Sequence, residues 1–357
     1  MSEELNHNWI NGQQLQTTDT LEVVNPANGD IVGQVPKVTE ANIQQSIEAA
    51  HGAFQQWSKY TADYRGDILE QWANNLLAKQ HDLALIMCEE QGKPYAEAYG
   101  EIGVCAKFIR WYAAEGKRIY GEIIPPSSPQ QRISVLKQPV GVCGLITPWN
   151  FPGAMVARKV APALAAGCTV IVKPSSETPR IAIAIFDELM ATEIDDGVAN
   201  ILTGSASLIS DTLFNDYRVK KMSFTGSTHI GKSLMQKAAN HITRISLELG
   251  GNAPAIVLPD ADLEAAADAI VDNKFENTGQ MCNGINTILV HKDVKAKFTD
   301  KVINRVKQLK VGPASEDDAQ VGPLINADAI NKVEQLVNEA QNCGATVATG
   351  GKKLPIS

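Results

Sequence analysis

The residues best suited to covalent chemistry lie in two short segments of the second half of the chain. Cys282 follows a Gly-Gln turn at the end of segment 277–282, and Glu248 precedes a glycine pair in segment 247–251. A thiolate can attack an aldehyde carbon, and a carboxylate can activate the water that hydrolyses the resulting thioester. Either residue alone is more often structural, so it is the joint setting that predicts a covalent site.

Two further observations bear on this site. The oxyanion formed on thiolate attack needs donors, and the side-chain amide of Asn150 and the backbone N–H of Cys282 can supply them, at about 3 kcal/mol per donor. The six histidines are scattered, and His229 and His241 are expected to be solvated helix residues. The sequence therefore offers no pattern for a Cys-His protease.

Composition limits the class of protein. With 357 residues, 44% hydrophobic and 20% charged, the chain is long enough for two domains. A net charge of -8 leaves no general basic surface, which argues against a nucleic-acid partner. The first residues do not resemble a signal peptide and no long apolar run is present, so we expect no membrane association and a cytoplasmic location. Six cysteines without a CxxC pair predict neither a disulfide framework nor a zinc site, and most should be buried.

The elements that must position these residues change along the chain. Residues 1–36 predict a hairpin-rich edge, and 39–120 predict successive amphipathic helices with breaks at 64–66 and 92–94. The proline-rich segment 124–129 cannot be helical, and 132–139 predicts an exposed strand. A projecting strand pair of this kind commonly joins subunits.

From Val140 onward short apolar runs alternate with amphipathic helices. Strands are predicted at 140–146, 169–172, 198–202 and 219–224, with helices beginning at Pro152, Pro179, near 205 and at Thr228. This pattern is typical of an α/β fold with a doubly wound parallel sheet, in which ligands bind at the carboxyl ends of the strands.

Two features at these strand ends suit a phosphate. Gly226-Ser227-Thr228 enters a helix, and the N-terminus of a helix offers free N–H donors. Lys173 ends a buried strand, where its cation could meet a ribose or a phosphate. The plainer alternatives are a simple N-cap at Ser227 and a solvated lysine at Lys173.

Five strings in order resemble the aldehyde dehydrogenase superfamily over the whole chain. They span residues 147–152, 165–174, 224–227, 248–251 and 275–282. The resemblance implies Cys282 as nucleophile, Glu248 as general base and Asn150 as oxyanion donor. The cofactor-binding residues that it implies are Thr147, Trp149, Asn150, Lys173, Pro174, Ser175, Ser176, Gly226, Ser227 and Leu249.

Within that superfamily the chain looks most similar to succinate-semialdehyde dehydrogenases, especially in segment 150–159. The resemblance implies that Arg158 holds the distal carboxylate of the substrate; the plainer reading is a helix-surface cation. Glu276 stands where these enzymes commonly place a second arginine, and Gly284 where many carry a second cysteine. Alternative substrates are glutarate semialdehyde, lactaldehyde or a betaine-type aldehyde, and an acylating reaction with coenzyme A is disfavoured by Glu248.

The resemblance also bears on the cofactor. Many NAD-preferring members have a glutamate at the place of Ser176, where it would repel a 2'-phosphate. Serine beside Lys173 favours NADP, while Glu177 next to it leaves NAD as the alternative.

The resemblance predicts a nicotinamide-cofactor-binding domain over 1–121 and 141–251, an oligomerisation segment at 122–140 and a catalytic domain over 252–357. Members of the superfamily continue past the position of Ser357, so we expect an incomplete catalytic domain and a poorly active chain, and homo-oligomers when the protein has full length. The alternative outside enzymes is an inactive fragment that serves as a partner for full-length subunits.

Overall fold

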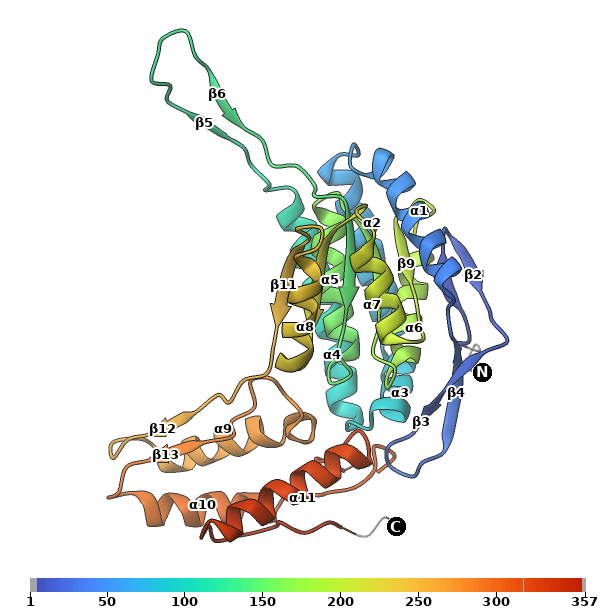
Figure 1. Ribbon diagram of the computed structural model, residues 1–357. Helices are drawn as coiled ribbons and strands as arrows, with labels where there is room; N and C mark the ends of the chain where they lie inside the picture. Colours follow the sequence, from blue (N-terminus) through green and yellow to red (C-terminus); the bar gives the residue numbers. More distant parts are fainter. Residues whose placement is uncertain (1–4, 317, 355–357) are drawn as a thin grey trace. The chain divides into compact units, whose positions relative to one another are not determined.

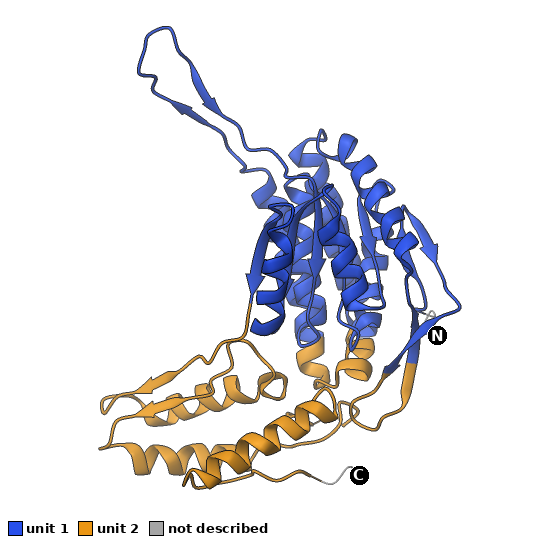
Figure 2. Cartoon of the chain, viewed as in Figure 1, with its two compact units in different colours: residues 1–23, 33–83, 99–248 blue, residues 24–32, 84–98, 249–357 orange. Residues whose placement is uncertain are grey.

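The computed structural model describes residues 5–316 and 318–354, which form two compact units (Figures 1 and 2). The first unit comprises residues 1–23, 33–83 and 99–248, and the second comprises 24–32, 84–98 and 249–357. Each unit has its own sheet, so each is described by itself.

A seven-stranded sheet forms the centre of the first unit, in the order β11-β10-β7-β8-β9-β1-β2. Its parallel strands are β7 (Val142–Ile146), β8 (Thr169–Lys173), β9 (Ala199–Ile201), β10 (Val219–Thr225) and β11 (Arg244–Glu248). The antiparallel strands β1 (Asn8–Ile10) and β2 (Gln13–Leu15) complete one edge. The chain runs from β7 to β9 in one direction and then crosses back to β10, so the strand order reverses between β7 and β10. Such a reversal is where doubly wound sheets bind ligands.

Helices connect the parallel strands, and the reversal of strand order at β7 and β10 is typical of doubly wound sheets, in which helices cover both faces. The helices of the first unit are α1 (Glu40–Trp57), α2 (Ala62–Ala78), α5 (Pro152–Ala165), α6 (Pro179–Met190), α7 (Ala206–Asn215) and α8 (Thr228–Ala238). Two further helices, α3 (Gln80–Gln91) and α4 (Tyr95–Gly116), belong to both units, because residues 84–98 are part of the second unit. The helices α5 and α6 pack together with α2 behind them, and α1 packs on α7 (Figure 1). Trp57, Trp72 and Phe186 are fully buried in this core.

Two strand pairs lie outside the main sheet. The pair β3 (Thr20–Val24) and β4 (Ile31–Pro36) follows the N-terminal strands, in agreement with the predicted hairpin-rich edge. The antiparallel pair β5 (Glu122–Ile124) and β6 (Ile133–Val135) projects as a long hairpin (Figure 1). Both of its strands are exposed, and Ile123 is 87% exposed.

The second unit has a small parallel sheet of β12 (Ala255–Val257) and β13 (Ile288–Val290). Its helices are α9 (Leu263–Phe275), α10 (Lys295–Lys307) and α11 (Ala327–Asn342), and a 3-10 turn, η1 (Glu276–Gly279), follows α9. Phe298 of α10 packs with Val257, Ala267 and Ile270 to form the local core.

The predicted strands and helices from Val140 onward are confirmed to within a few residues, as is the break at 92–94. The predicted break at 64–66 is wrong, because these residues lie inside α2. Arg65 is buried there and donates from Nε to the carbonyl of Ala165 at 3.0 Å. A β-carbon at Gly66 would lie 3.3 Å from the carbonyl oxygen of Ala113, so this glycine allows α2 and α4 to approach closely. None of the described helices is both long and apolar enough to cross a membrane.

Candidate active site and cofactor edge

The carboxyl ends of four parallel strands meet along one edge of the main sheet. Ile146 pairs with Lys173 on one side and with Phe224 on the other, and Thr225 pairs with Glu248. The segments that follow these strands carry nearly all the cofactor residues predicted from the sequence. This edge includes the point where the strand order reverses.

Lys173 is the cation of this edge. Its side chain is buried, which lowers its pKa from 10.5 to about 8 because desolvation disfavours the ammonium form. It donates from Nζ to the hydroxyl of Ser176 at 3.5 Å, and no carboxylate among the described residues forms an ion pair with it. The alternative of a solvated lysine is therefore wrong. A buried cation without an acidic partner fits an anionic ligand.

The N-terminus of α8 supplies backbone donors at the same edge. Ser227 caps the helix by accepting a hydrogen bond from the N–H of Ile230 at 3.3 Å, so the predicted N-cap is confirmed. The N–H of Gly226 donates to the carbonyl of Glu248 at 3.0 Å. A β-carbon at Gly226 would lie 2.5 Å from the ring of Phe224, so a larger residue here would require the ring to move. Phosphate groups bind readily at such a helix start.

The start of α5 differs from that of α8, because a carboxylate of the protein already accepts hydrogen bonds from its free N–H groups. The carboxylate of Glu101 accepts hydrogen bonds from the N–H groups of Gly153 and Ala154 at 2.9 and 3.0 Å. Glu101 is buried on α4 and replaces the side-chain cap that Phe151 cannot provide. No local pattern in the sequence predicts this cap, which occupies backbone donors at the start of α5, close to Asn150 in the chain.

The turn between β7 and α5 contains Thr147, Trp149 and Asn150. Thr147 is buried and its N–H donates to the carbonyl of Lys173 at 3.1 Å, which ties the two strand ends together. The side-chain oxygen of Asn150 accepts a hydrogen bond from the N–H of Phe151 at 3.1 Å. The amide nitrogen is the donor group of this side chain, and an oxyanion needs a donor.

Glu248 ends β11 and is exposed. A second buried lysine lies near it: Lys159 of α5 donates from Nζ to the hydroxyl of Ser223 at 2.8 Å. Desolvation lowers the pKa of Lys159 to about 8, while the charge of Glu248 acts in the opposite direction. The sequence assigned no role to Lys159, since its burial depends on packing that a local pattern does not reveal.

Arg158, the predicted substrate-binding residue, lies on the accessible side of α5. Its guanidinium carbon lies 4.3 Å from the ring centroid of Phe108 on α4, a cation–π distance. The neighbouring positions on α5 are mostly buried, whereas Arg158 is exposed. The residue therefore presents a cation that is held in place by an aromatic ring.

Cys282 belongs to the second unit and is exposed, as is Glu276. Gly251 approaches its backbone closely, because a β-carbon there would lie 2.9 Å from the carbonyl oxygen of Cys282. Leu249 and Gly250 connect that glycine to Glu248. Four of the other cysteines are buried, as predicted: Cys88, Cys105, Cys143 and Cys168.

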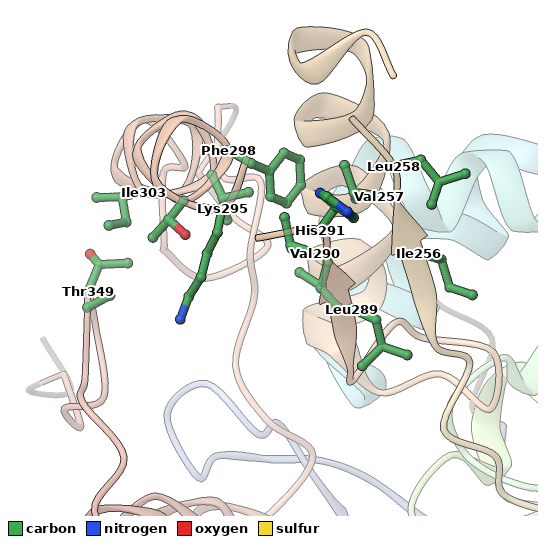
Figure 3. Close-up of a pocket in the computed structure, with 14 residues that line it drawn as sticks. Ile256, Val257, Leu258, Leu289, Val290, His291, Lys295, Phe298, Ile303 and Thr349 are labelled. Atoms are coloured by element: carbon green, nitrogen blue, oxygen red, sulfur yellow. The ribbon is translucent and has the colours of Figure 1, made fainter. Parts of the chain in front are cut away.

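A separate hollow of about 750 Å³ lies in the second unit beside β12 and β13 (Figure 3). Its walls are mainly apolar and include Val257, Val290 and Phe298, with His291 and Lys295 among the few polar groups. None of the residues predicted from the sequence to form the site lines this hollow.

A doubly wound sheet with a buried lysine at the carboxyl ends of its strands is typical of α/β units that bind nucleotide cofactors. Residues 9–356 match the model of the aldehyde dehydrogenase family, and the chain belongs to that family. It is 45% identical to the glutarate-semialdehyde dehydrogenase of Pseudomonas putida, over 97% of this chain and 72% of the relative. It is 46% identical to the NADP-dependent succinate-semialdehyde dehydrogenase of Escherichia coli, over 96% of this chain and 72% of that enzyme. The crystal structure of succinate-semialdehyde dehydrogenase from Burkholderia pseudomallei superposes with a TM-score of 0.98 at 43% identity, covering 100% of this chain and 75% of that one.

Proposed function

We propose that this aldehyde dehydrogenase oxidises a semialdehyde that carries a distal carboxylate, with succinate semialdehyde as the first candidate and NADP as cofactor. The proposal rests chiefly on one observation. A buried, unpaired Lys173 lies at the edge of the sheet where the strand order reverses, in the same row of strand ends as Glu248. The same edge therefore carries a candidate cofactor-binding residue, Lys173, and a candidate general base, Glu248.

The residues of the edge fit a nicotinamide dinucleotide. The cofactor would supply a two-electron acceptor for the hydride. Lys173 and Ser176 would hold the ribose and its 2'-phosphate, since both can donate hydrogen bonds and neither is negative. The N–H groups at the start of α8 would bind the pyrophosphate. Buried hydroxyls of Thr147 and Thr225, which have no hydrogen-bond partner among the described residues, also lie at the ends of these strands.

We assign the covalent steps to three side chains. The sulfur of Cys282 forms a bond to the aldehyde carbon, and the amide of Asn150 and the N–H of Cys282 hold the resulting oxyanion. Loss of hydride from that carbon leaves a thioester on Cys282. Glu248 then takes a proton from water, the water oxygen bonds to the carbonyl carbon, and the carbon–sulfur bond breaks to release the acid and restore the thiolate.

Chain geometry supports a shared role for Glu248 and Cys282. Gly251 lies against the carbonyl of Cys282, and only two residues separate it from Glu248. Three residue steps span at most about 11 Å. Chain connectivity alone therefore keeps the backbone of Glu248 within about 11 Å of that of Gly251.

The choice of substrate rests on Arg158. An exposed guanidinium steadied by Phe108 can accept a carboxylate in a bidentate pair. Glutarate semialdehyde, which is one methylene longer, is the second candidate because a relative of 45% identity is named for it. The exposed carboxylate of Glu276 would oppose either anion if it faced the substrate.

We also propose functions for the parts of the chain. The first unit would bind the cofactor, the second would carry the nucleophile, and the hairpin of β5 and β6 would join subunits. Exposed apolar residues on that hairpin, including Ile123 and Leu136, support its role in a homo-oligomer. Deleting 122–136 and measuring the mass in solution by light scattering would test this assignment.

The function is tested by mass spectrometry of trapped intermediates. Succinate semialdehyde and NADP should produce NADPH, and the Glu248→Gln variant should accumulate a mass increment on the peptide that contains Cys282. The Cys282→Ser variant should yield neither product. Arg158→Ala should reduce kcat/KM for succinate semialdehyde by about 10- to 100-fold, the loss of a charged hydrogen bond, and leave propionaldehyde nearly unchanged. An equal loss for both aldehydes would remove Arg158 from substrate binding, and an adduct on another cysteine would overturn the mechanism.

A further inference from the structure

The backbone just before Cys282 has an unusual conformation. Asn277, Thr278 and Gly279 all have positive φ angles, of 49°, 59° and 74°. This left-handed region costs roughly 1 kcal/mol or more for a residue with a β-carbon, and threonine tolerates it poorly. Three such residues in succession persist only where surrounding contacts hold them.

Residues from the corner between α3 and α4 provide one set of contacts. Asn277 is fully buried, and its N–H donates to the carboxylate of Glu97 at 2.9 Å. Its side-chain oxygen accepts a hydrogen bond from Nε2 of Gln91 at 2.8 Å. Gln91 is itself fully buried and accepts a hydrogen bond from the N–H of Lys93 at 2.9 Å. Gln91 and Glu97, both distant in sequence, thus form hydrogen bonds with the first residue of the left-handed turn.

The later residues of the turn, and Gln280 after it, make further hydrogen bonds that hold the same conformation. Gln280 donates from its N–H and from Nε2 to the carbonyl of Asn277, at 3.0 and 3.2 Å. Its side-chain oxygen accepts a hydrogen bond from the N–H of Ile325 at 3.0 Å. The hydroxyl of Thr278 donates to the carbonyl of Gly322 at 3.2 Å. All of these contacts lie within the second unit.

We propose that Gln91 and Glu97 are positioning residues for the nucleophile, an inference that rests on the proposed function of Cys282. Among the described residues, none forms a hydrogen bond with the exposed thiol of Cys282, so the backbone decides where its sulfur and N–H point. Only Gln280 and Met281 separate that backbone from the left-handed turn. Gln91 and Glu97 act on the reaction only through Asn277, by holding the N–H of Cys282 where the oxyanion forms.

The test compares two reactions of the same thiol in the full chain. Acylation by p-nitrophenyl acetate passes through an oxyanion and needs the N–H of Cys282, whereas alkylation by iodoacetamide forms no oxyanion. Neither reaction transfers a hydride, so neither depends on the cofactor. Rates are expressed per Cys282 labelled, with Cys282→Ser as the blank for the exposed Cys343.

Gln91→Leu should lower the acylation rate about 10- to 100-fold and change alkylation by less than about threefold, because a displaced oxyanion donor affects only the first reaction. Glu97→Ala should behave in the same way, and Glu97→Gln, which keeps an acceptor for the N–H of Asn277, should recover most of the acylation rate. A purely structural role would change the number of reactive thiols but leave the ratio of the two rates unchanged, which would overturn the proposal.

A glycine pair provides the matched control and avoids dependence on the folding of the Gln91 variant. Asn277→Gly keeps a residue that tolerates positive φ but removes the side chain gripped by Gln91, so the ratio should fall. Asn11→Gly makes the same change at another asparagine with positive φ (53°), outside this turn, and should keep the ratio within about threefold of the wild type. Equal ratios for the two glycine variants would contradict the positioning role. If the wild type acylates no faster than Cys282→Ser, the nucleophile assignment fails and the positioning role fails with it.

Discussion

The buried ammonium of Lys173 predicts that binding of NADPH depends on pH. Its pKa is about 8 in the free protein because burial disfavours the charged form. The protonated lysine attracts a 2'-phosphate and the neutral amine does not. Raising the pH through 8 should therefore weaken binding, and below about pH 7 the affinity should be nearly constant.

The magnitude follows from the fraction of protonated lysine. If only the charged form binds, the dissociation constant is multiplied by 1 + 10^(pH-8), which is about 1.1 at pH 7 and about 11 at pH 9. We expect a tenfold loss of affinity across this range, equal to about 1.4 kcal/mol. The 2'-phosphate has its second pKa near 6, so it stays fully ionised and adds no dependence of its own.

Fluorescence titration of NADPH at pH 7, 8 and 9 would measure the effect without turnover. The matched variant is Lys173→Met, which should bind NADPH about 10- to 100-fold more weakly at pH 7, with little change up to pH 9. NADH should show a smaller dependence in the wild type, because it lacks the 2'-phosphate. A wild-type dissociation constant that stays flat to pH 9, or a slope that survives in Lys173→Met, would refute the role of this lysine.

Three further predictions concern the elements around the edge. Glu101→Ala should lower stability by about 2 kcal/mol in urea unfolding, because two N–H groups of α5 lose their acceptor, and Glu101→Gln should recover part of it; equal stabilities would count against the cap. Between pH 8 and about 10.5 the unfolded chain still binds the proton that Lys159 has lost, so Lys159 should contribute about 3 kcal/mol to the rise in stability with pH. The rise should be smaller by this amount in Lys159→Met, and an unchanged pH slope in the variant would disprove this. Gly226→Ala should cost about 1–3 kcal/mol because its β-carbon would meet the ring of Phe224, and adding Phe224→Leu should restore most of it; no rescue would show that the ring is not the obstacle.

Local patterns in the sequence predicted the parallel strands and their order along the chain. Short apolar runs such as 169–172 are fully buried, and the helix starts at Pro152, Pro179 and Thr228 were found because proline and serine mark them. The break expected at 64–66 was wrong because Gly66 serves the close approach of two helices there, not a turn. Strand β11, which carries Glu248, was not among the predicted strands, since its alternating pattern is short and half exposed.

The position of Lys173 was predicted, but its burial was not. A lysine at the end of a strand can extend into solvent or fold beneath a ligand, and the apolar run before it is compatible with both. The burial of Lys159 was not predicted either, and its neighbour on the same helix, Arg158, is exposed. Burial of a charged side chain depends on which distant helices pack over it, and one sequence contains no signal for that packing.

Motifs in the sequence therefore predicted the residues expected to do chemistry. They did not predict the side chains that form hydrogen bonds with the backbone of the site. Glu101 lies 52 residues from the N–H of Gly153 that it binds, and Gln91 lies 186 residues from Asn277. Such partners cannot be recognised from the sequence, because most glutamate and glutamine residues on helices are exposed to solvent. Their burial separates them from surface residues of the same type: Glu101 is 5% exposed and Gln91 is fully buried. A buried polar side chain costs free energy unless it is satisfied, so each hydrogen bond to a site backbone both removes that cost and fixes the site. Substitutions at these two positions should therefore impair their sites as severely as many substitutions within the motifs themselves.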